Sequence, residues 1–181
     1  MTTIRVISNG YGEDAIAARL IHAIGPNAYD FDVFPLVGDG HAYSSMGLVP
    51  KITQPILPSG GFLLRLKDLL SDLWSGLFMQ FQKQRRVLVN AHADYQIVVG
   101  DVFALFMATY KQSIPTVFFP TAKSERAIPH YDLELTYIRK NADLVFPRDQ
   151  ETYDRFNQQQ IPSRFFGNPM FDDMHSDASK G

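Results

Sequence analysis

Short apolar runs alternate with amphipathic stretches along nearly the whole chain. The runs Ile97–Val99 and Val117–Phe119 are continuous, and such runs are typical of central strands that are covered on both faces. The stretches between the runs have the apolar spacing of helices. Strands that alternate with helices indicate βαβ units. The sequence therefore predicts an α/β fold with a parallel sheet and helices on both faces.

The same pattern places the individual elements. Strands are predicted at Ile4–Ser8, Phe31–Leu36, Lys51–Ile52, Tyr95–Gly100, Thr116–Pro120, Asp143–Pro147 and Arg164–Gly167. Helices are predicted at Asp14–Ile24, Phe62–Ala91, Val102–Tyr110, Leu133–Arg139 and Asp149–Gln158. We expect one domain over residues 1–175, followed by a polar tail or cut linker at 176–181.

The helix predicted at Phe62–Ala91 has an apolar stripe that is wider than one buried face needs. One interpretation is a long helix that faces the core. The other is an apolar surface that meets a membrane or a lipid, with cations at its end near anionic headgroups. The residues that would make this contact are Leu63, Trp74, Phe78, Arg85 and Arg86.

The turn after the first strand is the strongest candidate site. It carries Asn9, Gly10, Gly12, Glu13 and Asp14 just where an amphipathic helix begins. Backbone N–H groups at such a turn are where α/β proteins hold ligands, off the carboxyl ends of parallel strands. Carboxylates suit a hydroxyl-rich ligand such as a sugar. The alternative is a tight strand–helix turn that Asp14 caps.

The glycine spacing of this turn also fits a dinucleotide fingerprint. Gly10, Gly12 and Ala15 match G-x-G-x-x-G/A, which supplies a tight turn and close backbone approach. The acidic residue that the fingerprint expects at the end of the second strand is missing there. Glu13 and Asp14 would also repel a pyrophosphate. A nucleotide-binding domain of an oxidoreductase or regulatory protein is therefore the second hypothesis.

Polar residues follow two further strands. Asp101 comes directly after Val98-Val99-Gly100, where it either caps the next helix or acts as a general base. Lys123 and Ser124 lie in the loop after Phe118-Phe119-Pro120. They either meet an anionic group or belong to a solvated loop.

Composition excludes several function classes. The formal net charge of -2 argues against general nucleic-acid binding. The chain has no cysteine, and its five histidines, at 22, 41, 92, 130 and 175, lack ligand spacing, so we expect no metal and no cofactor. The chain enters a strand almost at once, so we expect no signal peptide. We also expect no spanning helix, because no apolar run reaches the ~18 residues it needs.

Several short segments together resemble one family. The opening strand followed by S-N-G-x-G-E-D, at Ser8 to Asp14, resembles the lipid-A-disaccharide synthase-related branch of glycosyltransferases. The other segments that carry the resemblance are Val37–Tyr43, Pro58–Phe62, Gly100–Asp101, Thr121–Ser124, Ala142–Phe146 and Phe166–Asp172. The resemblance extends over nearly all of the chain, and it is to the N-terminal half of such an enzyme.

The resemblance implies a GT-B architecture, in which two Rossmann-like domains enclose a cleft. Its members transfer a sugar from a UDP-sugar to a lipid-linked acceptor, without a metal, at the cytoplasmic membrane face. The N-terminal domain holds the acceptor and the C-terminal domain the nucleotide. This chain ends just where the second domain should begin, so we expect UDP-sugar binding only together with a C-terminal domain.

The resemblance also implies roles for the candidate residues. Asp101 would be the general base. A sugar or lipid-linked acceptor would be held by Asn9, Gly10, Gly12, Glu13, Asp14, Lys123 and Ser124. A cytoplasmic protein, peripheral on the inner face of the membrane, is the implied location. A non-catalytic module that docks a lipid or a partner through Leu63, Trp74 and Phe78 is the third hypothesis.

Overall fold

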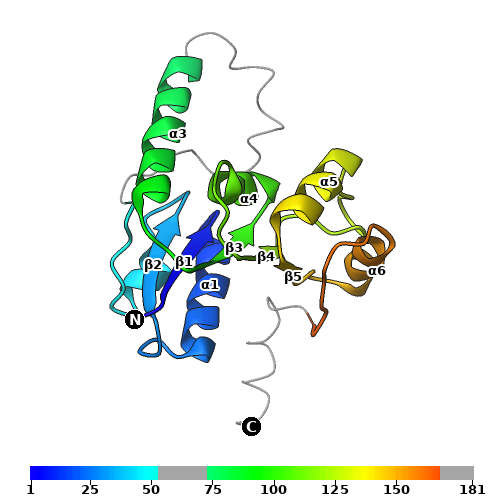
Figure 1. Cartoon of the computed structure of the whole chain (residues 1–181), viewed down its shortest axis with the longest axis horizontal. Coiled ribbons are helices and arrows are strands. Elements are labelled where there is room, and N and C mark those ends of the chain that lie inside the picture. Colours follow the sequence, from blue (N-terminus) through cyan, green and yellow to red (C-terminus); the bar gives the residue numbers. More distant parts are fainter. Residues whose placement is uncertain (53–72, 168–181) are drawn as a thin grey trace.

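The computed structural model describes residues 1–52 and 73–167, and these form one α/β sandwich (Figure 1). The strands are β1 (Thr3–Ser8), β2 (Asp30–Pro35), β3 (Tyr95–Gly100), β4 (Thr116–Pro120) and β5 (Leu144–Val145). The helices are α1 (Tyr11–Ile24), α2 (His41–Ser44), α3 (Leu73–Asn90), α4 (Val102–Thr109), α5 (Asp132–Asn141) and α6 (Gln150–Gln158).

The strands of this part of the chain form a five-stranded sheet in the order β2-β1-β3-β4-β5, and every pair is parallel. Val6 of β1 lies opposite Val33 of β2 and Ile97 of β3. β3 is buried along almost its whole length, which explains its continuous apolar run, whereas in β4 the residues Val117 and Phe119 are only half-buried. The predicted α/β class, with helices on both faces of a parallel sheet, is confirmed.

Each face of the sheet has its own apolar core, because successive strand residues point to opposite faces. On one face, Val6 and Ile97 pack with α1 and α2, through residues such as Ile16, Ile21 and Tyr43. On the other face, the core continues into α3, α4, α5 and α6, through Leu88, Leu105, Ile138 and Phe156 among others. Figure 1 shows α3 and α4 on the opposite side of the sheet from α1.

Some element boundaries differ from the sequence prediction. α1 begins at Tyr11 rather than Asp14, and the four-residue α2 was not predicted. The predictions of strands at Lys51–Ile52 and Arg164–Gly167 are wrong. Each segment makes only a fragment of a strand ladder: the Lys51 N–H donates to the Val33 carbonyl, and the Arg164 N–H donates to the Val145 carbonyl. The domain boundary predicted at residue 175 lies outside the described residues.

Candidate functional site at the carboxyl ends of β1, β3 and β4

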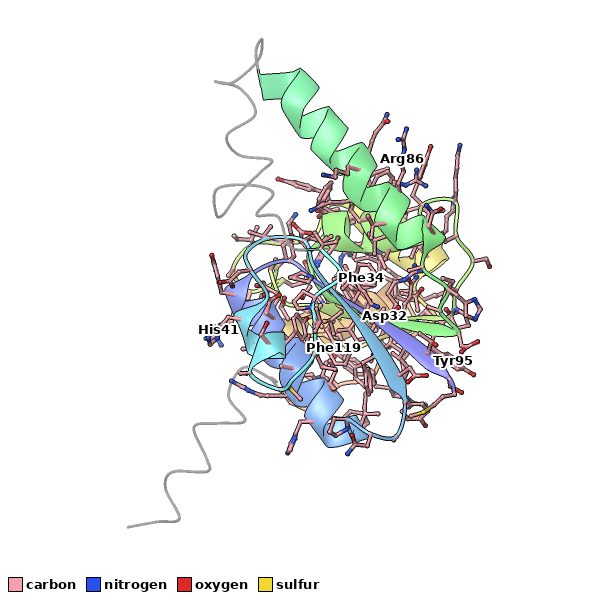
Figure 2. All side chains as sticks on the ribbon, turned by 90° about the vertical axis from the view of Figure 1, so that its left-hand side faces the viewer. Asp32, Phe34, His41, Arg86, Tyr95 and Phe119 are labelled. Atoms are coloured by element: carbon pink, nitrogen blue, oxygen red, sulfur yellow. The ribbon has the colours of Figure 1, made fainter. Side chains whose placement is uncertain are left out.

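The strand order creates a switch point at one edge of the sheet, the place where open α/β sheets have their binding crevice. From β1 the chain first goes to β2 on one side, and it later returns to place β3 on the other side of β1. The connections therefore leave β1 and β3 in opposite directions, and α/β sheets bind ligands off the carboxyl ends at such a switch point. The turn Asn9–Asp14 follows β1, and Asp101 follows β3. The structure thus brings these predicted site residues to one edge, and Figure 2 shows His41 near this edge and Tyr95 at the opposite one.

The turn after β1 depends on glycine at one position but not at another. Gly10 is the N-cap of α1 with a φ of +154°, and a Cβ there would lie 3.1 Å from Oε2 of Glu13. A Cβ on Gly12 would meet nothing within 4 Å. The fold therefore does not need glycine at position 12, and the missing side chain leaves open space beside the turn.

Asp14 does not cap α1, because the helix begins three residues before it. Its side chain is 1 % exposed, and its Oδ1 accepts a hydrogen bond of 2.5 Å from the Ser8 hydroxyl. The same hydroxyl lies 2.6 Å from the buried Tyr43 hydroxyl. Burial raises the pKa of Asp14, the Ser8 hydrogen bond opposes this, and the charges of Glu13 and Asp39 assist it, which together brings the pKa to about 6. Asp14 ties α1 to β1 and α2, and its predicted contact with a sugar stays a prediction.

Asp101 is the N-cap of α4, so that half of its sequence prediction is confirmed. A carboxylate oxygen accepts a hydrogen bond of 2.9 Å from the Ala104 N–H. Burial raises the pKa of Asp101, the hydrogen bond from Ala104 opposes this, and the charge of Glu13 raises the pKa further. The residue is half-buried, which leaves it within reach of a ligand in the crevice. A raised pKa beside a second carboxylate is typical of a general base, the role that stays a prediction.

Glu13 connects the turn after β1 to the end of β4. Its Oε1 accepts a hydrogen bond of 3.2 Å from the Thr121 hydroxyl. Thr121 is buried, its N–H donates to the Gly100 carbonyl at 3.0 Å, and its own carbonyl accepts from Nη1 of Arg148 at 2.9 Å. The ends of β1, β3 and β4 are therefore joined by specific contacts.

The loop after β4 is more strongly fixed than a solvated loop. The Lys123 ammonium contacts both carboxylate oxygens of Glu134, at 2.8 and 2.7 Å, and lies 4.4 Å from the centre of the Tyr131 ring. Ser124 is buried, and its hydroxyl accepts from the Arg126 N–H. The charge of Lys123 is thus already matched by a carboxylate, so an anionic acceptor group would have to compete with Glu134. The predicted acceptor contacts of both residues remain predictions.

The residues assigned to membrane contact are only partly described. Leu63 lies outside the described residues, as do the side chains of Trp74 and Phe78. On α3, Nη2 of Arg85 donates to the Tyr110 carbonyl at 2.7 Å, and the Arg85 guanidinium lies 4.3 Å from the centre of the Tyr110 ring. Arg86 is exposed (Figure 2). Within residues 1–52 and 73–167, no helix is long and apolar enough to cross a membrane.

The described residues also show how the possible metal ligands lie and where the surface is hollowed. No group of three or more His, Asp or Glu side chains there is arranged to hold a metal ion. A shallow hollow is lined by Met1, Thr2, Asp94 and Tyr95. It lies at the amino ends of β1 and β3, away from the edge where parallel sheets bind their ligands.

Gly100 is the position where the site has least tolerance for a side chain. Its φ is +149°, and a Cβ would lie 2.7 Å from Cβ of Asn9. We expect Gly100→Ala to lower the free energy of unfolding by about 1–3 kcal/mol, because the strained backbone and the clash act together. Gly12→Ala is the matched control. It should leave stability unchanged or raise it by up to about 1 kcal/mol, because alanine favours helices. Urea unfolding of both variants measures this, and equal effects at the two positions would contradict it.

Sequence reasoning missed two residues of the site. Tyr43 was noted only as part of the segment Val37–Tyr43 that carries the resemblance. Its buried hydroxyl lies beside Ser8 because of α2, and this helix is too short to show a periodic apolar pattern. Thr121 was known only as the start of the loop after β4. Placing it against Glu13 requires the strand order, which puts β4 one strand away from β1.

The comparisons with known proteins agree with the fold. No protein-family model matches the chain, and no curated protein matches it. Among solved structures, UDP-N-acetylglucosamine 2-epimerase from Rickettsia bellii is similar, with a TM-score of 0.61 and 14 % sequence identity. The match covers 100 % of this chain and 49 % of the epimerase, so the chain spans about half the length of that protein. The chain therefore has a Rossmann-like α/β fold similar to a GT-B-type domain.

Proposed function

We propose that the chain is the acceptor-binding half of a glycosyltransferase that uses a UDP-sugar. In the proposed step, the acceptor hydroxyl gives its proton to Asp101. The hydroxyl oxygen forms a bond to the anomeric carbon, and the bond from that carbon to the phosphate oxygen breaks as UDP leaves with the electron pair. The observation that carries the proposal is a pair of carboxylates, Glu13 and Asp101, at the switch point of the sheet.

The charge of the crevice favours a sugar over a phosphate-bearing ligand in this half. Glu13 lies in the first turn of α1, with Oε2 beside Gly10, where a dinucleotide domain would place a pyrophosphate. The nearby Lys123 is paired with Glu134 and does not offset this charge. A helix N-terminus already occupied by a carboxylate repels a second anion. This argues against the nucleotide-binding alternative based on Gly10, Gly12 and Ala15.

The similar structure and the resemblance support the donor class. The similar solved structure is named for a UDP-sugar, and the resembling family uses UDP-sugars. In the proposal, the donor is held by a second domain, and the acceptor is a sugar or a lipid-linked sugar. Contact with a membrane through Leu63, Trp74, Phe78, Arg85 and Arg86 belongs to the same proposal. An epimerase is the second candidate, because the similar structure carries that name.

Binding measurements on this chain test the assignment to an acceptor half. We expect UDP and UDP-N-acetylglucosamine to bind with a Kd above about 1 mM, which is less than about 4 kcal/mol of binding free energy. The reason is the negative charge of Glu13 and Asp101 in the crevice. Isothermal titration calorimetry measures this, with Glu13→Gln as the control for that charge. Micromolar binding of UDP by the unaltered chain would contradict the proposal.

The two candidate functions differ in their need for an acceptor. A transferase releases UDP faster when an acceptor sugar is added, whereas an epimerase converts the UDP-sugar without one. Following UDP release and sugar interconversion side by side, in the protein with both halves, separates them. Interconversion without an acceptor would replace the transferase proposal by the epimerase.

A further inference from the structure

A hydrogen bond between side chains crosses the carboxyl end of the central strand β3. Its acceptor, Glu13, lies in the first turn of α1, which follows β1, and its donor, Thr121, directly follows β4. In the sheet, β3 lies between β1 and β4. The Glu13–Thr121 contact therefore spans the point where β3 ends at Gly100 and passes into Asp101.

The surroundings hold this bridge in place. The Thr121 N–H is bonded to the Gly100 carbonyl, and the Thr121 carbonyl to the Arg148 guanidinium. On the other side, Asn9 packs so closely on Gly100 that a Cβ there would clash. Thr121 is 5 % exposed, so its hydroxyl has little freedom to turn to water instead. The Glu13 carboxylate is thus held by one hydroxyl, that of Thr121, which is itself fixed by its contacts with Gly100 and Arg148.

We infer that Glu13 is a positioning residue whose carboxylate, held by Thr121 across the end of β3, keeps a negative charge beside Asp101 and makes it a stronger base. The inference rests on the proposed function, in which Asp101 takes the proton of the acceptor hydroxyl. A neighbouring anion favours the protonated form of a carboxyl group. The bridge would therefore favour the very proton transfer that Asp101 has to perform.

The charges around Asp101 and Asp14 separate the effect of Glu13 from that of its neighbours. Burial and the charge of Glu13 raise the pKa of Asp101, while backbone N–H groups of α4 lower it. The guanidinium of Arg148 also lies on this edge, where it donates to the Thr121 carbonyl at 2.9 Å. Asp14 has its pKa raised by Glu13 and also by Asp39. Glu13 thus raises the pKa of both carboxyl groups, whereas the charge of Asp39 raises that of Asp14 alone.

An NMR titration of the carboxyl carbons of Asp101 and Asp14 tests the inference without any substrate. In Glu13→Gln, we expect the pKa of both groups to fall, because a nearby negative charge is removed. In Asp39→Asn, the control, we expect the pKa of Asp14 to fall and that of Asp101 to stay. An unchanged Asp101 in Glu13→Gln, or an equal fall in Asp39→Asn, would overturn the inference.

Two variants of Thr121 test the bridge itself. Thr121→Val removes the hydroxyl and should lower the pKa of Asp101, because Glu13 is then free to turn away. Thr121→Ser keeps the hydroxyl, so the pKa of Asp101 should equal that in the unaltered chain. If Glu13→Gln fails to fold, this pair still decides: no difference between valine and serine at position 121 rejects the bridge.

The pH dependence of kcat/KM then connects the bridge to function. A general base must be unprotonated, so the acidic limb of the profile follows its pKa. With Glu13→Gln, in the protein with both halves, we expect the acidic limb to move to lower pH and the plateau to fall. If the titration shows the coupling but the limb does not move, Asp101 is not the base. That result removes the proposed role of Asp101 and with it the role of Glu13, whereas a missing coupling rejects the bridge alone.

Discussion

Asp101→Asn is expected to reduce kcat/KM of the proposed two-domain glycosyltransferase by roughly 10²–10⁴-fold, because a positioned base, the role proposed for Asp101, contributes about that much. The amide cannot accept the proton of the acceptor hydroxyl. It can still accept the hydrogen bond from the Ala104 N–H, because asparagine and aspartate are about equally good N-caps. The free energy of unfolding should therefore stay the same or rise slightly, since a half-buried charge is removed. UDP release with an acceptor, together with urea unfolding, measures both quantities.

Two control variants separate the cap from the base. Asp101→Ser also keeps a capping oxygen and lacks the base, so it should behave like Asp101→Asn. Asp101→Ala loses the cap as well, and should lower stability by about 1 kcal/mol in addition to the loss of turnover. Turnover that survives in asparagine and serine but falls in alanine would show that Asp101 acts only as a cap.

The fold was largely predictable because the sheet is parallel and covered on both faces. β3 and β4 were located to the residue, since their apolar runs end sharply at Gly100 and Pro120. The errors occurred where tertiary contacts replace a pattern. The backbone at Lys51 and at Arg164 is hydrogen-bonded to a neighbouring strand through only one or two groups. Such short pairings produce no alternation of apolar and polar residues that a sequence could show.

Buried polar contacts were the part that the sequence could not reveal. Arg5 lies in the middle of an apolar strand and is fully buried. Its guanidinium donates to the Gln112 side chain at 2.6 Å and to the Ala91 carbonyl, groups more than 80 residues away. The partners of Ser8 and Glu13 were hidden for the same reason. The carboxyl end of the sheet could be predicted as the site, but the side chains that meet there depend on strand order.

The stability of the chain is expected to depend on pH through Asp14. Burial, opposed by the Ser8 hydrogen bond and assisted by the charges of Glu13 and Asp39, raises the pKa of this carboxyl group to about 6. In the unfolded chain the pKa is about 3.9. The folded state therefore binds this proton more tightly, and the resulting stability is fully present below about pH 4. It is lost as the pH rises through about 6, and the two-unit difference amounts to about 3 kcal/mol.

Asp14→Asn removes this titration, so the difference in unfolding free energy between the unaltered chain and the variant should change by roughly 2–2.5 kcal/mol between pH 4 and 7.5, the remainder lying below pH 4. As the pH rises, the unfolding free energy of the unaltered chain falls relative to that of the variant. Urea unfolding followed by circular dichroism at a series of pH values measures this.

Asp149→Asn is the control, because hydrogen bonds from Ser124 and Thr152 lower the pKa of Asp149 despite its partial burial. The stability that Asp149 contributes is lost only in more acidic solution. In Asp149→Asn the unfolding free energy should therefore still fall between pH 4 and 7.5, as it does in the unaltered chain. A difference between the unaltered chain and Asp14→Asn that is flat over this range would mean that Asp14 is ionised, or reaches water, in the folded state.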